Sequence, residues 1–70
     1  MTIQVNGESR EVQEGLTVTG LLQQLGFPGD RVAVERNLDI LPRDQWAATH
    51  LAAGDRFEIV HFVGGGLDAG

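Results

Sequence analysis

The dipeptide Asn6-Gly7 is the feature that most constrains the fold of this chain. It follows residues 2–5, in which polar and apolar side chains alternate with the period of a β-strand. An Asn-Gly pair supplies the two residues with positive φ that a type I′ turn requires, so it predicts a tight hairpin. Residues 9–13 should therefore return antiparallel to the first strand, with Val12 pointing inward.

One amphipathic helix is predicted after the hairpin. Four apolar residues recur at helical spacing, namely Val18, Leu21, Leu22 and Leu25. Thr17 precedes them as an N-cap residue, and Gly26 stands where a left-handed residue commonly ends a helix. Pro28 prevents the helix from continuing. The predicted helix therefore runs from Thr17 to Leu25.

The remaining apolar segments predict strands. Residues 31–35 and 56–62 alternate as strands do, and the short apolar pair Ile40-Leu41 follows a turn at Asn37. Residues 42–46 begin with proline and predict a short helical turn. The class is therefore α+β. The expected fold is a β-grasp, or ubiquitin-like, domain, in which one main helix packs across a mixed sheet of four to five strands.

The chain divides at residue 63. Seventy residues build one core at most, so we predict that residues 1–63 form a single β-grasp domain. Residues 64–70 read GGGLDAG and are predicted to form a flexible glycine-rich tail. Glycine loses more conformational entropy on ordering than any other residue, which disfavours a fixed structure there.

Composition excludes several kinds of function. Ten acidic and five basic residues give a net charge of -5, which disfavours nucleic acid and anionic membranes as partners and suits a basic protein surface. The chain has no cysteine, and no metal site is predicted. The sequence has neither a visible signal peptide nor a membrane-spanning run, so we expect a soluble, cytoplasmic protein. We predict no catalytic residues, because no nucleophile–base pair or carboxylate pair has a suitable spacing.

The final predicted strand separates two faces. Phe57, Ile59 and His61 alternate onto one face, and Val60 and Phe62 lie on the other. If the first face fills the core, then Val60 and Phe62 form an outer apolar pair beside the tail. Such a pair predicts a partner-docking surface. The pattern is equally compatible with loops or the sheet edge covering this pair.

The tail has the properties of a segment that delivers a carboxylate to another protein. Gly64, Gly65 and Gly66 lack side chains and can thread a narrow channel, and three extended residues reach about 10 Å. A carboxylate reacts with nucleophiles only when its oxygen becomes a good leaving group. Adenylation by ATP, in an enzyme that supplies Mg²⁺, achieves this, and sulfide or a persulfide can then displace AMP. A glycine run is also typical of linkers, but here it directly follows the last strand.

The middle and the end of the chain resemble the ThiS sulfur carriers. The residues that carry the resemblance are Val32 to Asn37, Ile40, Pro42-Arg43, Trp46, Leu51, Gly54-Asp55 and Glu58 to Gly66. The opening Val5-Asn6-Gly7 and the predicted helix also match. The resemblance therefore covers residues 1–66 without a large gap.

This resemblance implies a β-grasp carrier with a set of partners. A ThiF-type adenylyltransferase, using ATP and Mg²⁺, would activate the terminal glycine. A cysteine desulfurase would act as sulfur donor, and the thiazole synthase ThiG would use the sulfur to build the thiazole of thiamine. Gly66 would then carry the adenylate and the thiocarboxylate, and Gly64 and Gly65 would thread the partner's active site. The chain would be a protein co-substrate, not an enzyme, and would bind no cofactor itself.

The chain departs from the family pattern at its end. Residues 67–70 lie beyond the expected terminus, so Gly66 has no free carboxylate in this sequence. A protease that trims the tail is one explanation, and a vector remnant or a shifted reading frame is another. A third makes Gly70 the working terminus, but it places Leu67 in a channel shaped for glycine.

Two other functions fit the same residues. One is a protease-matured sulfur carrier for another pathway, such as the synthesis of molybdopterin, cysteine or another thio-metabolite. The other is a β-grasp interaction module that forms no covalent adduct. Detection of an adenylate or a thiocarboxylate separates the carriers from the module.

Overall fold

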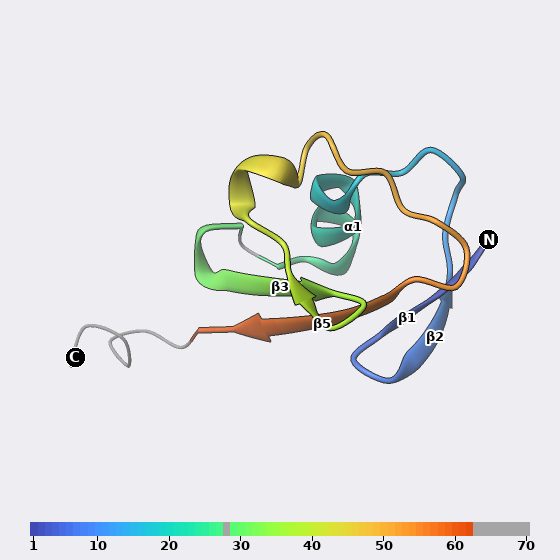
Figure 1. The fold of residues 1–70 in the computed structure, drawn as a ribbon, viewed down its shortest axis with the longest axis horizontal. Helices are drawn as coiled ribbons and strands as arrows, with labels where there is room; N and C mark the ends of the chain where they lie inside the picture. Colours follow the sequence, from blue (N-terminus) through green and yellow to red (C-terminus); the bar gives the residue numbers. More distant parts are fainter. Residues whose placement is uncertain (28, 63–70) are drawn as a thin grey trace.

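The structure, a computed structural model, describes residues 1–27 and 29–62 (Figure 1). Its elements in chain order are β1 (Thr2–Val5), β2 (Glu8–Glu11), α1 (Val18–Leu25), the 3₁₀ helix η1 (Gly29–Arg31), β3 (Val32–Arg36), β4 (Asp39–Ile40), the 3₁₀ helix η2 (Arg43–Gln45) and β5 (Arg56–His61). This order confirms the predicted hairpin, helix and later strands. No helix in the described ranges is long and apolar enough to cross a membrane.

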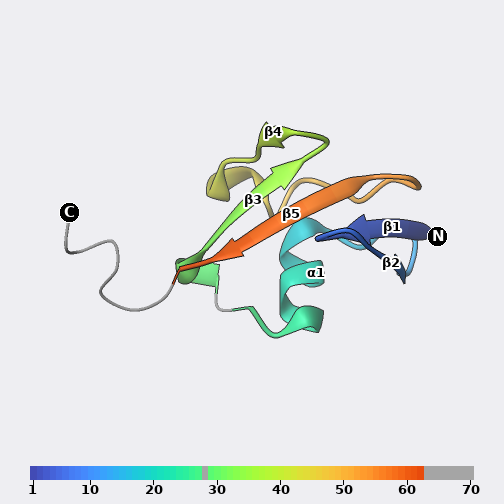
Figure 2. The same ribbon diagram turned by 90° about the horizontal axis from the view of Figure 1, so that it is seen from below.

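The strands of the described residues form one mixed, five-stranded sheet in the order β2-β1-β5-β3-β4. β1 runs parallel to β5, with Val5 opposite Phe57, and the other neighbouring pairs are antiparallel. β5 therefore lies at the centre of the sheet with β1 beside it (Figure 2). With α1 packed across one face, this is the predicted β-grasp arrangement.

The first hairpin turns where the Asn-Gly pair predicts. Asn6 and Gly7 have φ values of 51° and 83°, as a type I′ turn requires. The returning strand is β2, Glu8–Glu11, instead of the predicted residues 9–13, because the two-residue loop lets pairing begin directly after Gly7. Val12 lies just beyond the strand and is partly buried against the core.

The predicted helix and both of its caps are confirmed. The Thr17 hydroxyl accepts a hydrogen bond from the Gly20 N–H at 3.1 Å, and Gly26 ends α1 with φ at 79°. Gly20 has a packing role within the helix. A Cβ atom at this position would lie 2.6 Å from Cδ1 of Leu16, so the glycine leaves room for that side chain beside the first turn.

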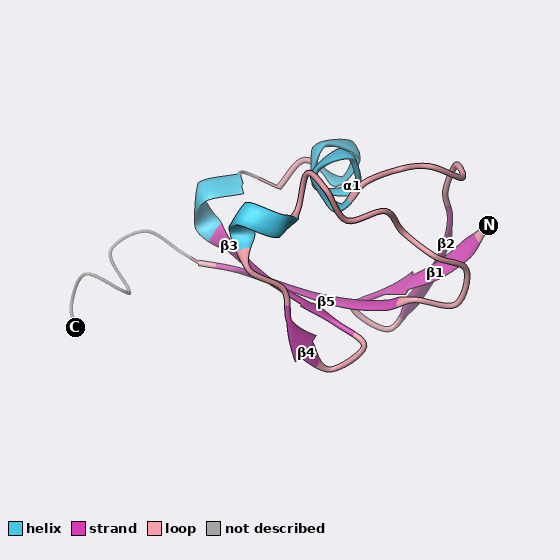
Figure 3. Cartoon of the chain, turned by 45° about the horizontal axis from the view of Figure 1, so that its top comes forward, coloured by secondary structure: helices cyan, strands magenta, loops and turns pink. Residues whose placement is uncertain are grey.

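The core fills the space between α1 and one face of the sheet (Figure 3). Its most completely buried large side chains are Phe57, Ile3, Leu21, Val18 and Val34. Trp46 is also buried, and its indole N–H donates to the Leu41 carbonyl at 3.0 Å. Within the described residues, the opposite face of the sheet carries no helix.

Candidate functional site

The candidate site is the C-terminal end of β5, where the chain continues into its glycine segment. Gly64, Gly65 and Gly66 lie outside the described residues. The described part of the site is therefore β5, the strand that precedes the glycines, together with the surface around that strand.

The two faces of β5 separate as predicted. Phe57 and Ile59 belong to the core, whereas Val60 is 56% exposed on the other face. Phe62, just after the strand, is half-buried, and its N–H donates to the Arg31 carbonyl at 2.7 Å. The predicted docking pair thus has one exposed member and one half-buried member. That a partner binds there stays a prediction.

His61, the last residue of β5, packs at this end of the strand. Its ring meets Phe27 edge-to-face, with centroids 6.0 Å apart and planes at 77°. Edge-to-face geometry is favourable for aromatic rings, which supports a structural role for the histidine. Among residues 1–27 and 29–62, no three His, Cys, Asp or Glu side chains are grouped to hold a metal ion.

Asn6 holds the middle of β5 through its side chain. β1 ends at Val5, and the Asn6 N–H donates to the Phe57 carbonyl at 2.8 Å. The Asn6 side chain then accepts from the Ile59 N–H at 2.7 Å and donates to the Ile59 carbonyl at 3.3 Å. One amide therefore replaces a strand residue in the ladder. The sequence identified Asn6 only as a turn residue, because its second role depends on a strand more than fifty positions away.

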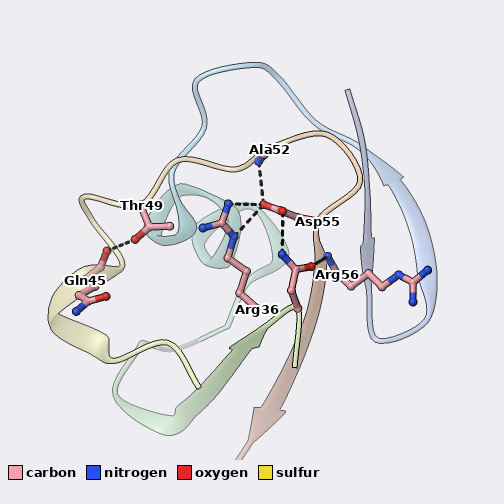
Figure 4. A network of polar contacts seen from close by, with 7 residues as sticks. Arg36, Gln45, Thr49, Ala52, Asp55 and Arg56 are labelled. Atoms are coloured by element: carbon pink, nitrogen blue, oxygen red, sulfur yellow. Dashed lines mark hydrogen bonds and ion pairs between the residues drawn. The ribbon is translucent and has the colours of Figure 1, made fainter. Parts of the chain in front are cut away.

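A buried carboxylate fixes the start of β5 (Figure 4). Asp55 is 6% exposed, and its Oδ2 lies 3.0 Å from Nε and 2.9 Å from Nη2 of Arg36. The same carboxylate accepts from the Ala52 N–H at 2.9 Å and from the Asn37 amide at 3.2 Å. Asn37 in turn accepts from the Arg56 N–H at 2.9 Å. The sequence indicated only a turn at Asn37, because the network joins two segments that are distant in the sequence, residues 36–37 and 52–56.

This environment lowers the pKa of Asp55 from its ordinary value of 3.8. Burial alone raises the pKa, because it disfavours the charged form. The Ala52 N–H, the Asn37 amide and the Arg36 guanidinium together outweigh that effect by stabilising the carboxylate. The hydrogen bonds and the ion pair of Asp55 therefore stabilise the start of β5.

The uncovered face of the sheet carries a further apolar side chain that the sequence did not reveal as exposed. Ile40 of β4 is 68% exposed and lies opposite Glu35 of β3. Leu41, its neighbour in the sequence, is partly buried against the core. An apolar pair in a short strand does not indicate which member faces water, so only the register shows that Ile40 shares the face of Val60.

Comparison with known proteins assigns the family. The ThiS family model matches residues 3–66. The chain belongs to the ThiS family. The matched range begins in β1 and runs through the three glycines after β5.

Individual relatives agree with this assignment. The sulfur carrier protein ThiS of Bacillus subtilis is 35% identical over 65 residues, which cover 91% of this chain and 98% of that protein. The crystal structure of the thiamine biosynthesis protein ThiS from Geobacter metallireducens is 39% identical, with a TM-score of 0.81 over 94% of this chain and all of that one. This similarity confirms the β-grasp fold.

A longer relative also contains this sequence pattern. The thiazole synthase of Paramagnetospirillum magneticum is 46% identical over 68 residues, which cover 97% of this chain but 21% of that protein. The chain therefore spans about a fifth of the length of that curated relative.

Proposed function

We propose that this chain is a sulfur carrier for thiazole formation in thiamine biosynthesis, acting as a co-substrate and not as an enzyme. The observation that carries this proposal is the family match, which extends through Gly66, the third glycine after β5. The ThiS relative from Bacillus subtilis, a named sulfur carrier, matches over nearly its whole length.

Gly66 is the proposed site of the covalent chemistry. One oxygen of its carboxylate attacks the α-phosphorus of ATP, which gives an acyl-adenylate and releases pyrophosphate. A ThiF-type adenylyltransferase supplies the Mg²⁺ and the phosphate-binding groups for this step. A hydrosulfide equivalent, provided through a cysteine desulfurase, then attacks the carbonyl carbon and displaces AMP, leaving a thiocarboxylate on Gly66.

The residues before Gly66 have properties that would let the tail enter a partner's active site. Gly64 and Gly65 present only backbone, so a channel that admits them excludes chains with larger side chains at these positions. From Phe62 to Gly66, four extended residues reach about 13 Å into a partner. Val60, exposed near the start of this segment, and the half-buried Phe62 form the proposed docking surface.

The residues that follow Gly66 must be removed before this chemistry. The match with the thiazole synthase covers 68 of the 70 residues of the chain, so it extends at least to Asp68. This extent favours a native segment over a vector remnant. We therefore include a protease that cleaves between Gly66 and Leu67 among the proposed partners.

The proposed acceptor of the sulfur is a ThiG-type thiazole synthase. Proteins named thiazole synthase in two organisms contain a region 46% identical to this chain. A carrier-like region within such a protein supports a direct encounter between carrier and synthase.

Mass spectrometry tests the proposal. A chain of residues 1–66 is incubated with ATP, Mg²⁺, a ThiF-type adenylyltransferase and a sulfur donor. The expected product is heavier by roughly 16 Da, the difference between sulfur and oxygen, a small change beside most covalent modifications. Without the sulfur donor, the AMP adduct should be found. Absence of both products on the 1–66 chain would sink the proposal.

The matched control is the chain of residues 1–70 under the same conditions. It should form neither product unless a protease first removes the last four residues. An adduct on the uncleaved control would move the reactive carboxylate to Gly70.

A further inference from the structure

Two glutamates lie directly opposite each other on the uncovered face of the sheet. Glu35 of β3 pairs in register with Glu58 of β5, so their side chains leave the same face. Opposite side chains in an antiparallel pair have Cβ atoms about 4.5–5.5 Å apart. Glu58 is exposed and Glu35 is half-buried. The two glutamates therefore occupy neighbouring positions in the middle of the sheet.

In the described part of the chain, neither glutamate takes part in an ion pair. The ion pairs there join Met1 to Glu11, Arg10 to Glu8 and Arg36 to Asp55, and no cationic group lies within 4.0 Å of Glu35 or Glu58. Arg36 follows Glu35 in the sequence, but it points to the opposite face, where Asp55 engages it. Arg56 lies on the same face two residues before Glu58, but it forms no ion pair with Glu58 within 4.0 Å, and the chain as a whole has a net charge of -5.

Like charges directly opposite each other destabilise a sheet. A neutral or oppositely charged side chain at either position would be more favourable for the isolated domain. The arrangement therefore favours a bound state in which a cation from outside the chain lies between the two carboxylates.

Apolar side chains flank the glutamate pair. Ile40 lies opposite Glu35 on one side, and Val60 lies two residues beyond Glu58 on the same face. Ile40 is 68% exposed and Val60 is 56% exposed. The surface formed by Ile40, Glu35, Glu58 and Val60 is thus an acidic pair between two apolar side chains. It is complementary to an arginine or lysine whose neighbours are apolar, since a cation that becomes desolvated against a carboxylate pair binds most strongly.

We propose that Glu35 and Glu58 receive a cationic side chain of the adenylating enzyme and determine which enzyme docks on this sheet face. The inference rests on the proposed carrier function and extends its docking surface. Charge complementarity identifies this occupant. An enzyme that adenylates this tail must hold the phosphates of ATP where the tail ends, so its surface near that point needs positive charge. Glu58 lies eight positions before Gly66, and eight extended residues reach about 26 Å, so the sheet face docks on the enzyme surface around the entrance to that site.

The test compares Glu35→Gln/Glu58→Gln with wild type in chains of residues 1–66. The double variant should melt a few degrees higher than wild type, because the repulsion within the sheet is removed. Its affinity for a ThiF-type adenylyltransferase, measured by calorimetry without ATP, should fall roughly tenfold or more, and the dependence of binding on salt should weaken. The matched control is Glu8→Gln/Glu14→Gln, which removes the same charge from the other end of the sheet and its following loop. Its affinity should stay within about twofold of wild type.

A second variant, Glu35→Lys, separates docking from stability. It places a cation opposite Glu58 within the chain, so the domain should remain folded while the enzyme loses its contact. A loss of affinity in this variant and in the double glutamine variant, but not in the control, supports the proposal. Unchanged affinity in the double glutamine variant, or an equal loss in the control, overturns it. Adenylation of the wild-type chain is measured in parallel. If it fails, the carrier function is wrong. If it succeeds while the double variant binds normally, only the role of the glutamate pair is wrong.

Discussion

Replacement of Asp55 by alanine should destabilise the domain more than replacement of any exposed carboxylate. The buried carboxylate accepts from Arg36, Asn37 and the Ala52 N–H over distances of 2.9–3.2 Å. A hydrogen bond to a charged group contributes about 1.5–3 kcal/mol, and these contacts are not additive. The Ala52 N–H and part of the Arg36 guanidinium would also lose their partner. We therefore expect Asp55→Ala to lower the free energy of unfolding by about 3 kcal/mol.

Denaturation of the variant and of wild type measures this loss. For a domain of this size, 1 kcal/mol shifts the melting temperature by about 4–8 °C, so the expected decrease is about 12–24 °C. Glu14→Ala removes an exposed carboxylate and serves as the control, with an expected change within about 0.5 kcal/mol. The double-mutant cycle of Asp55→Ala and Arg36→Ala should show coupling of about 1 kcal/mol or more. A loss below about 1 kcal/mol in Asp55→Ala, or no coupling in the cycle, would refute the reasoning.

Three further predictions concern acid stability, the β5 ladder and the tail. Because the folded pKa of Asp55 lies below its ordinary value of 3.8, its contribution is fully present above that value and is lost as the pH falls through the folded pKa. In Asp55→Asn, the free energy of unfolding should therefore decrease less steeply than in wild type as the pH falls into the acid range. An unchanged pH dependence would contradict this. Asn6→Gly keeps the positive φ but removes both contacts to Ile59, so it should lower the free energy of unfolding by about 1–3 kcal/mol, and full stability would count against the amide's role in the ladder. Gly65→Val, in chains ending at Gly66, should abolish adenylation without changing the melting temperature, and normal adenylation would argue against a narrow channel.

Local signals in the sequence were sufficient to predict most of the fold. The Asn6-Gly7 turn depends on backbone conformation at two adjacent residues, and both adopt the required positive φ. The helix depends on an apolar stripe between a hydroxyl cap at Thr17 and a left-handed Gly26, and all three features are present. Each of these signals lies within a few residues, so no knowledge of the rest of the chain was needed.

The supports of the candidate site depend instead on contacts between distant segments. Asn6 bonds to Ile59, which lies 53 positions away, and Asp55 joins Arg36 over 19 positions. Polar residues of this kind are typical of turns, and their sequence neighbours do not reveal a distant partner. The exposure of Ile40 followed from strand register, which a two-residue strand does not specify by pattern.

Glu35 and Arg36 are adjacent in the sequence, but their charges have opposite effects on the stability of the sheet. Adjacent side chains of opposite charge in a sequence suggest a local ion pair. Successive residues of a strand, however, point to opposite faces, so the two charges in β3 do not meet. Arg36 turns inward and neutralises Asp55, which stabilises the start of β5. Glu35 turns outward toward Glu58, where its charge opposes folding of the isolated chain. The same strand pair thus gains stability on its inner face and leaves Glu35 and Glu58 without an ion pair on its outer face. A substitution that relieves the outer repulsion should therefore stabilise the domain and weaken docking at once, whereas loss of the inner pair should destabilise the domain itself.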